Sequence, residues 1–96
     1  MKVIVLGSTG SIGRQALDVA EHLGLSIIAI TGNKNIKLLE EQARHFLPQA
    51  VAVADEKAAQ ELKVRLADTS INVLSGESGI IQVAGMETDV VVSAII

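Results

Sequence analysis

Cysteine, tryptophan and tyrosine are absent from this sequence of 96 residues, and Phe46 is its single phenylalanine. The lack of cysteine excludes disulfide bonds and thiolate chemistry from this chain. With one large aromatic side chain, a core has to be built from Val, Ile, Leu and Ala. Hydrophobic residues make up 49% of the chain, which is enough for the core of one globular domain spanning residues 1–96.

Basic charge and long apolar runs are also scarce. The 8 Lys and Arg residues are outnumbered by 11 Asp and Glu residues, so no basic surface for nucleic acid is predicted. The first apolar run, residues 3–6, is too short for a signal peptide, whose core needs roughly 7–15 apolar residues, or for a membrane span of about 20. We therefore expect a soluble, cytoplasmic protein with neither a membrane nor a nucleic-acid partner.

Short apolar runs alternate along the chain with segments of helical periodicity. Runs that are apolar throughout are typical of strands buried on both faces of a parallel sheet. The predicted strands cover residues 3–6, 25–30, 50–54, 71–74 and 89–96. Strict alternation of strand and helix predicts an α/β fold, with a doubly wound, mainly parallel sheet and helices on both faces.

Four amphipathic segments supply the predicted helices, the last of them over residues 77–86. Apolar residues at helical spacing mark the inner faces of the first three. The predicted inner residues are Ile12, Ala16, Val19, Ala20 and Leu23 in the first helix, Ile36, Leu39, Ala43 and Phe46 in the second, and Ala58, Ala59, Leu62 and Leu66 in the third. Gly24 is predicted to stop the first helix, and Asp55 to cap the third.

The last predicted strand, residues 89–96, is the longest, and its mostly apolar composition is typical of a buried strand. A parallel sheet binds its ligands beyond the carboxyl ends of its strands. This sequence stops where such a loop is expected to begin, so we interpret it as a truncated segment of a longer chain. The alternative is a small domain that ends naturally on a central strand.

A glycine-rich loop joins the first predicted strand to the first helix, with Gly7, Gly10 and Gly13 in the spacing G-x-x-G-x-x-G. This spacing is a variant of the dinucleotide-binding fingerprint. The three glycines are expected to permit a sharp turn, a close approach of backbone to a pyrophosphate, and tight packing of the helix. Free amides at the helix start stabilise negative charge, and Thr9 and Ser11 can add hydroxyl donors. The alternative is a tight turn that binds nothing.

The tip of the second strand carries the sequence Thr31-Gly32-Asn33-Lys34-Asn35 and no acidic residue. NAD-binding folds usually place Asp or Glu here, bonded to the ribose 2′-hydroxyl. An acid would repel a 2′-phosphate, whereas Lys34 attracts one, and Asn33 and Asn35 can donate hydrogen bonds to it. The segment predicts NADPH in preference to NADH, and the alternative is that Lys34 is only a solvated loop lysine.

No residue of this sequence is predicted to be catalytic or to bind a metal. His22 and His45 lie late in predicted helices, without metal-ligand spacing to other histidines or carboxylates, and are interpreted as ordinary solvated or dipole-stabilised residues. Acidic residues are interspersed with lysines and arginines on the predicted helices, a pattern that is typical of solvent-exposed helix faces. These acidic residues are Glu40, Glu41, Asp55, Glu56 and Glu61.

The glycine loop, followed by Gln15 and Leu17-Asp18-Val19, closely resembles the N-terminus of the 1-deoxy-D-xylulose 5-phosphate reductoisomerase family. Further blocks in the same order extend the resemblance over essentially the whole chain. These blocks are residues 34–35, 38–42, 51–56, 73–76 and 89–95. The resemblance implies a Rossmann-like domain that binds NADPH, taken from a homodimeric, cytoplasmic or plastidic enzyme that also uses Mg or Mn. It implies that the enzyme converts a phosphorylated ketose to 2-C-methyl-D-erythritol 4-phosphate in non-mevalonate isoprenoid biosynthesis.

The resemblance also implies which residues contact the cofactor. At the pyrophosphate it places Thr9, Gly10, Ser11 and Ile12, at the ribose phosphate Asn33, Lys34 and Asn35, and at the end of the last strand Ala94 and Ile95. The family often has a small residue where Asn33 stands, so this contact departs from its pattern. The family's metal and substrate ligands have no matching positions here, and we therefore expect cofactor binding without turnover.

Two other functions remain open from the residues. A semialdehyde dehydrogenase of NADP-dependent type also begins with a G-x-T-G-x-x-G loop, but the matching blocks after Ile30 favour the reductoisomerase family. A non-catalytic module that senses NAD(P) would carry the same glycine loop.

Overall fold

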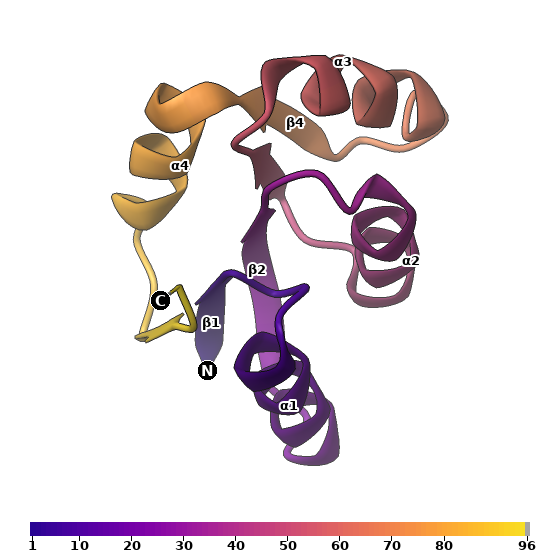
Figure 1. Cartoon of the computed structure of the whole chain (residues 1–96). Helices are drawn as coiled ribbons and strands as arrows, with labels where there is room; N and C mark the ends of the chain where they lie inside the picture. Colours follow the sequence, from indigo (N-terminus) through magenta and orange to yellow (C-terminus); the bar gives the residue numbers. More distant parts are fainter. Residues whose placement is uncertain (96) are drawn as a thin grey trace.

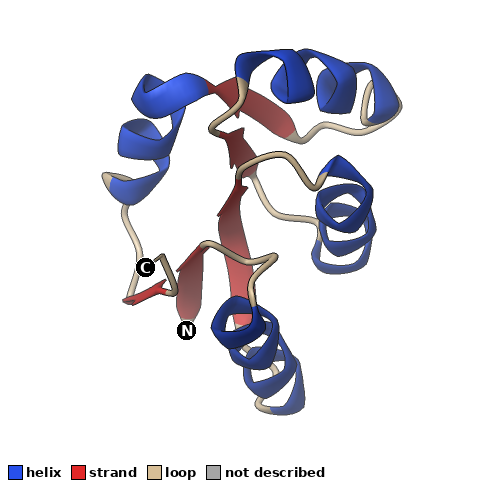
Figure 2. Cartoon of the chain, viewed as in Figure 1, coloured by secondary structure: helices blue, strands red, loops and turns tan. Residues whose placement is uncertain are grey.

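The computed structural model describes residues 1–95, and residue 96, the last of the fifth predicted strand, lies outside the described part. Strands and helices alternate throughout, as the sequence predicts (Figures 1 and 2). The elements are β1 (Lys2–Leu6), α1 (Ser11–His22), β2 (Ser26–Gly32), α2 (Ile36–Phe46), β3 (Ala50–Val53), α3 (Glu56–Arg65), β4 (Asn72–Ser75), α4 (Gly76–Ala84) and β5 (Val90–Ser93). Among the described residues, no helix has the length and apolar character needed to cross a membrane.

The five strands form one sheet in the order β4-β3-β2-β1-β5, and every neighbouring pair is parallel. The chain moves outward from β1 to β4 and then returns to the opposite side of β1 to add β5. The connection that leaves β1 therefore runs to β2 on one side of it, whereas β5 is added on its other side. In open α/β sheets this reversal creates the crevice in which ligands bind.

Helices cover both faces of the sheet, which confirms the doubly wound architecture. Figure 1 shows α1, α2 and α3 on one side and α4 on the other. Neighbouring residues of a strand point to opposite faces, so Val3 and Val5 pack beneath the three helices while Ile4 packs with Val83 of α4. The core is aliphatic on both faces, as the composition requires.

Several local predictions are confirmed. The Asp55 carboxylate accepts a hydrogen bond from the Ala58 amide at 2.9 Å and caps α3. Gly24 follows the end of α1 with φ +67°, a conformation that favours glycine. The four residues predicted to form the inner face of the third helix are all buried.

The predicted inner face of the first helix is wrong in three positions. Ile12, Val19 and Leu23 are 57%, 58% and 66% exposed. The residues of α1 that are buried are Gly13, Leu17 and Ala20. Successive residues are about 100° apart around a helix, so the true face is offset by one residue from the predicted one. Gly13 takes the inward position because α1 begins in direct contact with the loop before it.

The fifth strand also differs from its prediction. β5 has 4 residues rather than eight and is not buried, since Val90 and Val91 are 37% and 44% exposed. It lies at the edge of the sheet, paired on one side with β1. The longest strand is β2, with 7 residues, because it continues through Thr31 and Gly32, which the sequence assigned to a loop.

An apolar groove of about 350 Å³ lies between α1 and the β5 edge. Ile12 and Val19 of α1 line it together with Val90 and Val92 of β5. Two of the residues that were wrongly assigned to the inner face of α1 therefore lie beside the edge strand of the described sheet.

Candidate functional site

The glycine loop, which runs from the end of β1 into the first turn of α1, needs glycine at its first and last positions, Gly7 and Gly13. Gly7 has φ +82°, which L side chains rarely adopt, and a Cβ there would lie 3.3 Å from the carbonyl oxygen of Ala94. A Cβ at Gly13 would collide with the carbonyl oxygen of Gly7 and approach the Ser8 Cα to 2.7 Å. The sharp turn and the close helix packing that the sequence predicts are therefore both present.

Gly10 differs from the other two loop glycines. Its φ of −78° and ψ of 170° are open to any residue. A Cβ there would find only the Gly7 carbonyl oxygen within 4 Å, at 3.8 Å. The fold therefore does not need glycine at this exposed position. Because Gly10 has no side chain, a bound molecule can approach the backbone of the loop closely at this position.

The N-terminus of α1 is open to an anion. The first backbone bond of the helix runs from the Arg14 amide to the Gly10 carbonyl at 2.9 Å, so the amides of Ser11, Ile12 and Gly13 precede the helical ladder. No side chain caps this end, and no acidic residue lies in the first turn. In the described chain, α1 alone combines these two features. The positive end of its dipole is uncompensated.

The segment between β2 and α2 lies directly beside the glycine loop. The Ser8 amide donates to the Thr31 carbonyl oxygen at 2.9 Å, and the Gly7 amide donates to the Thr31 hydroxyl at 2.9 Å. Asn33 and Lys34 are exposed beyond the end of β2. The Lys34 ammonium forms no ion pair within residues 1–95.

Asn35 has a structural role that the sequence analysis did not assign to it. It is the N-cap of α2, and its Oδ1 accepts the Leu38 amide at 3.2 Å. Lys34 therefore lies in a short segment that is held between the end of β2 at Gly32 and the capped start of α2. The predicted contact of Asn35 with a cofactor stays a prediction.

The end of β5 lies against the same loop from the other side. The Ala94 amide donates to the Leu6 carbonyl oxygen at 2.8 Å, which places Ala94 beside Gly7. The structure thus brings all the sequence-predicted residues to one edge of the sheet, where β1, β2 and β5 end. They are Gly7, Thr9, Gly10, Ser11, Ile12, Gly13, Asn33, Lys34, Asn35, Ala94 and Ile95.

The sequence analysis did not identify three polar residues that lie beneath the glycine loop. Ser8, Thr31 and Gln42 are all buried there. A signal for Gln42 was available, because it lies next to Ala43 on the predicted inner face of α2. A polar side chain at such a position needs buried partners, and the structure supplies them from Ser8 of the glycine loop.

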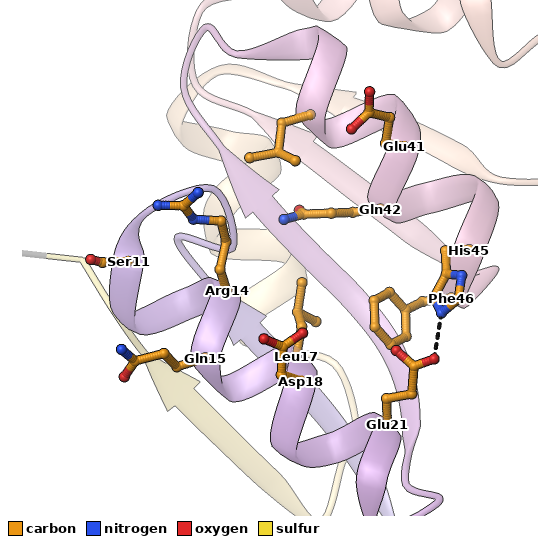
Figure 3. Close-up of a pocket in the computed structure, with 11 residues that line it drawn as sticks. Ser11, Arg14, Gln15, Leu17, Asp18, Glu21, Glu41, Gln42, His45 and Phe46 are labelled. Atoms are coloured by element: carbon orange, nitrogen blue, oxygen red, sulfur yellow. Dashed lines mark hydrogen bonds and ion pairs between the residues drawn. The ribbon is translucent and has the colours of Figure 1, made fainter.

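A groove of about 530 Å³ runs between α1 and α2 (Figure 3). Ser11 and Arg14 lie at one end of it, beside the glycine loop, and the His45 ring approaches Glu21 at 2.7 Å at the other. His45 is exposed, in agreement with its interpretation as a solvated residue. Within residues 1–95, no three His, Asp or Glu side chains are grouped so that they could hold a metal.

Shifted pKa values occur on the surface between α2 and α3, away from the glycine loop. Hydrogen bonds from Arg44 and Arg65 lower the pKa of Glu40. The Arg44 guanidinium, 2.8 Å from a carboxylate oxygen of Asp68, lowers the pKa of Asp68. These are solvated ion pairs, as the charge pattern predicts. Both carboxyl pKa values are lowered, whereas a carboxyl group that acts as a general acid or base near neutral pH needs a raised pKa.

Comparison with known proteins gives one family. The sequence model of 1-deoxy-D-xylulose 5-phosphate reductoisomerase matches residues 3–96. Proteins of this name from Agathobacter rectalis and Halothermothrix orenii are 48% and 47% identical to the chain over 99% of its length. The chain spans 26% of the length of each of these relatives.

Solved structures agree with the sequence comparison. The reductoisomerase from Zymomonas mobilis in complex with NADPH matches 98% of this chain with a TM-score of 0.92 and 34% identity, and the match covers 25% of that protein. A reductoisomerase in complex with NADPH, fosmidomycin and magnesium matches 99% of this chain with a TM-score of 0.91 and 29% identity. The chain belongs to the 1-deoxy-D-xylulose 5-phosphate reductoisomerase family, and it corresponds to about a quarter of the relatives it matches.

Proposed function

We propose that this chain binds NADPH across the carboxyl ends of β1, β2 and β5, as the cofactor-binding segment of a 1-deoxy-D-xylulose 5-phosphate reductoisomerase. The observation that carries the proposal is Gly10, a glycine that the fold does not require, placed at the uncapped start of α1. NADPH is present in two related structures that match nearly the whole chain.

The pyrophosphate lies at the N-terminus of α1 in this proposal. The exposed backbone at Gly10 admits its oxygens, and the amides of Ser11 and Ile12 donate to them with support from the helix dipole. Thr9 and Ser11 add hydroxyl donors. Gly7 and Gly13 hold the loop in the shape that this binding needs.

The 2′-phosphate of the adenosine ribose lies over the exposed residues after β2. Lys34 supplies a positive charge, and Asn33 and Asn35 supply amide donors. No acidic residue lies in this segment to repel the phosphate. Ala94 borders the cofactor where β5 ends.

The whole protein, in this proposal, rearranges and reduces a phosphorylated ketose to 2-C-methyl-D-erythritol 4-phosphate, as a cytoplasmic homodimer. NADPH supplies the hydride, and this segment only binds and orients it. The divalent metal named in the related structures does not fit here, because the described residues group no suitable ligands. Residues of the remaining three quarters of the enzyme would have to hold the metal.

Titration of the chain with NADPH, followed by the cofactor's fluorescence, tests the proposal. Gly10→Ala adds a methyl group where the cofactor pyrophosphate approaches the loop and is expected to weaken binding at least ~10-fold, or about 1.4 kcal/mol. The matched control is Gly85→Ala, because Gly85 also has an ordinary φ of −92° and lies after α4. Equal affinity of the Gly10→Ala and Gly85→Ala chains would contradict the proposed site.

A further inference from the structure

The buried polar side chains of the described residues gather in one place. They are Ser8, Thr31 and Gln42, with exposures of 0%, 1% and 7%, and they come from the glycine loop, the end of β2 and the middle of α2. No buried side-chain nitrogen or oxygen within residues 1–95 lacks a hydrogen-bond partner. A single satisfied polar cluster therefore lies directly beneath the loop.

Gln42 holds Ser8 through both ends of its amide group. Its Nε2 donates to the Ser8 carbonyl oxygen at 2.9 Å, and its Oε1 accepts from the Ser8 hydroxyl at 2.6 Å. The Ser8 amide is held in turn by the Thr31 carbonyl at 2.9 Å. All the polar groups of Ser8 therefore point into the protein and are bonded there.

The fixed carbonyl of Ser8 determines the direction of the next amide. The peptide bonds of the described chain are all trans, and in a trans peptide unit the C=O and N–H groups point in opposite directions. Because the Ser8 carbonyl points inward to Gln42, the Thr9 N–H points away from α2, toward the open side of the loop. This amide has no hydrogen-bond partner within residues 1–95.

Fold stability alone does not account for this arrangement. A buried amide group gains little net stability even when its hydrogen bonds are satisfied. An apolar side chain of similar size would fill the inner face of α2 beside Leu39 and Ala43, which are fully buried. The gain that is specific to Gln42 is the orientation of one loop peptide.

We propose that Gln42 is a positioning residue, which turns the peptide between Ser8 and Thr9 so that the Thr9 N–H becomes a donor to the cofactor pyrophosphate. This inference rests on the proposed NADPH site and adds one donor to it, together with the side chain that orients the donor. Gln42 itself does not touch the cofactor.

Binding of three ligands to the wild-type and Gln42→Leu chains tests the proposal. NADPH and NADH both contain a pyrophosphate, whereas 2′-AMP contains the adenosine and its 2′-phosphate without one. We expect Gln42→Leu to weaken NADPH and NADH by a similar factor of ~10, as for a lost oriented donor, and to leave 2′-AMP binding within about twofold. Gln60→Leu, at an exposed glutamine of α3, is the matched control.

The Thr9 amide itself provides a second measurement. In ¹⁵N-labelled wild-type chain its NMR signal should shift on addition of NADPH, and in Gln42→Leu this shift should be much smaller. Ser8→Ala keeps the carbonyl bond to Gln42 and removes only the hydroxyl, so it should retain most of the affinity. This milder variant keeps the test decisive if Gln42→Leu fails to fold, because a Ser8→Ala loss as large for 2′-AMP as for NADPH would indicate a purely structural cluster.

The outcomes separate this inference from the proposed function. If wild-type chain binds none of the three ligands, the NADPH site itself is wrong. If wild-type chain binds NADPH but Gln42→Leu binds it equally well, the positioning role is wrong and the site stands. An equal loss for all three ligands would also overturn the positioning role, because it would mean that Gln42 only supports the fold.

Discussion

The carbonyl oxygen of Gly7 occupies the space that a Cβ of Gly13 would need. The two residues lie at opposite ends of the glycine loop, so the loop closes on itself and α1 begins in contact with the end of β1. The obstruction consists of backbone atoms, which cannot move aside as a flexible side chain can.

Gly13→Ala is therefore expected to lower the free energy of unfolding by about 1–3 kcal/mol, as for overpacking of a rigid core. Gly10→Ala is the comparison, since its methyl group meets no close neighbour, and it should cost no more than about 1 kcal/mol through its N-cap position. Urea denaturation followed by circular dichroism measures both. A Gly13→Ala chain as stable as Gly10→Ala would show that the loop can open without cost.

Lys34→Ala should change cofactor preference rather than general binding. Loss of its charge removes a partner of the 2′-phosphate, so NADPH affinity should fall about 10-fold while NADH affinity stays nearly constant. Parallel titrations with both cofactors give the ratio. Lys37→Ala, in the first turn of α2, is the control for general loss of positive charge. An unchanged ratio in Lys34→Ala would mean that this lysine is only solvated.

The ion pairs between α2 and α3 should make stability depend on acid. The pKa of Glu40 lies below its ordinary 4.5, and that of Asp68 below its ordinary 3.8, because arginines bond both carboxylates. A lowered pKa in the folded state stabilises the fold above the ordinary pKa, and this contribution is lost as the pH falls through the lowered value.

The melting temperature of Arg44→Met should therefore lie below that of the wild type at neutral pH and converge on it in strong acid. The difference should be small and should shrink with added salt, because these groups are on the surface. Arg14→Met is the control, since Arg14 forms no ion pair in the described part of the chain. A difference that persists unchanged in acid would point to packing of the Arg44 stem instead.

The exposed edge of β5 should make the chain self-associate. Val90 and Val91 are partly exposed on β5, whose outer side has no partner strand within residues 1–95, and such edges pair with other chains unless charge prevents it. Sedimentation at high protein concentration should detect dimers, and Val90→Lys, placed in the apolar groove, should shift them to monomers. A wild-type chain that stays monomeric would contradict this prediction.

The sequence was most informative where backbone geometry leaves little choice. Short, wholly apolar runs predicted a parallel sheet, and Gly7 and Gly13 predicted a turn and a close contact that only glycine tolerates. Lys34 could be placed because the end of β2 always adjoins the end of β1 in this topology. These inferences depend on local residues and on one fold rule.

The wrong predictions have a common physical origin, because each depends on tertiary neighbours that the sequence does not reveal. Ile12 and Val19 look like core residues because α1 is apolar on two adjacent stripes, and only the position of the sheet decides which stripe is inside. β5 has the composition of a buried strand but lies at an edge in the described structure. Gln42 could not be linked to Ser8 from the sequence, because 34 positions separate them.

The position of β1 between β2 and β5 also affects the order in which this site can form. Its two partners are β2, the second strand of the chain, and β5, the last. Next to the β5 pairing, the Lys2 amide donates to the Asp89 carboxylate across 87 positions of the sequence. During synthesis the glycine loop and the end of β2 can form early. The part of the site at Ala94 can form only after β5 has been made and has paired with β1. A cofactor that contacts all three ends would bind the finished sheet better than any intermediate, and it would thereby stabilise the latest and most distant pairing in the fold.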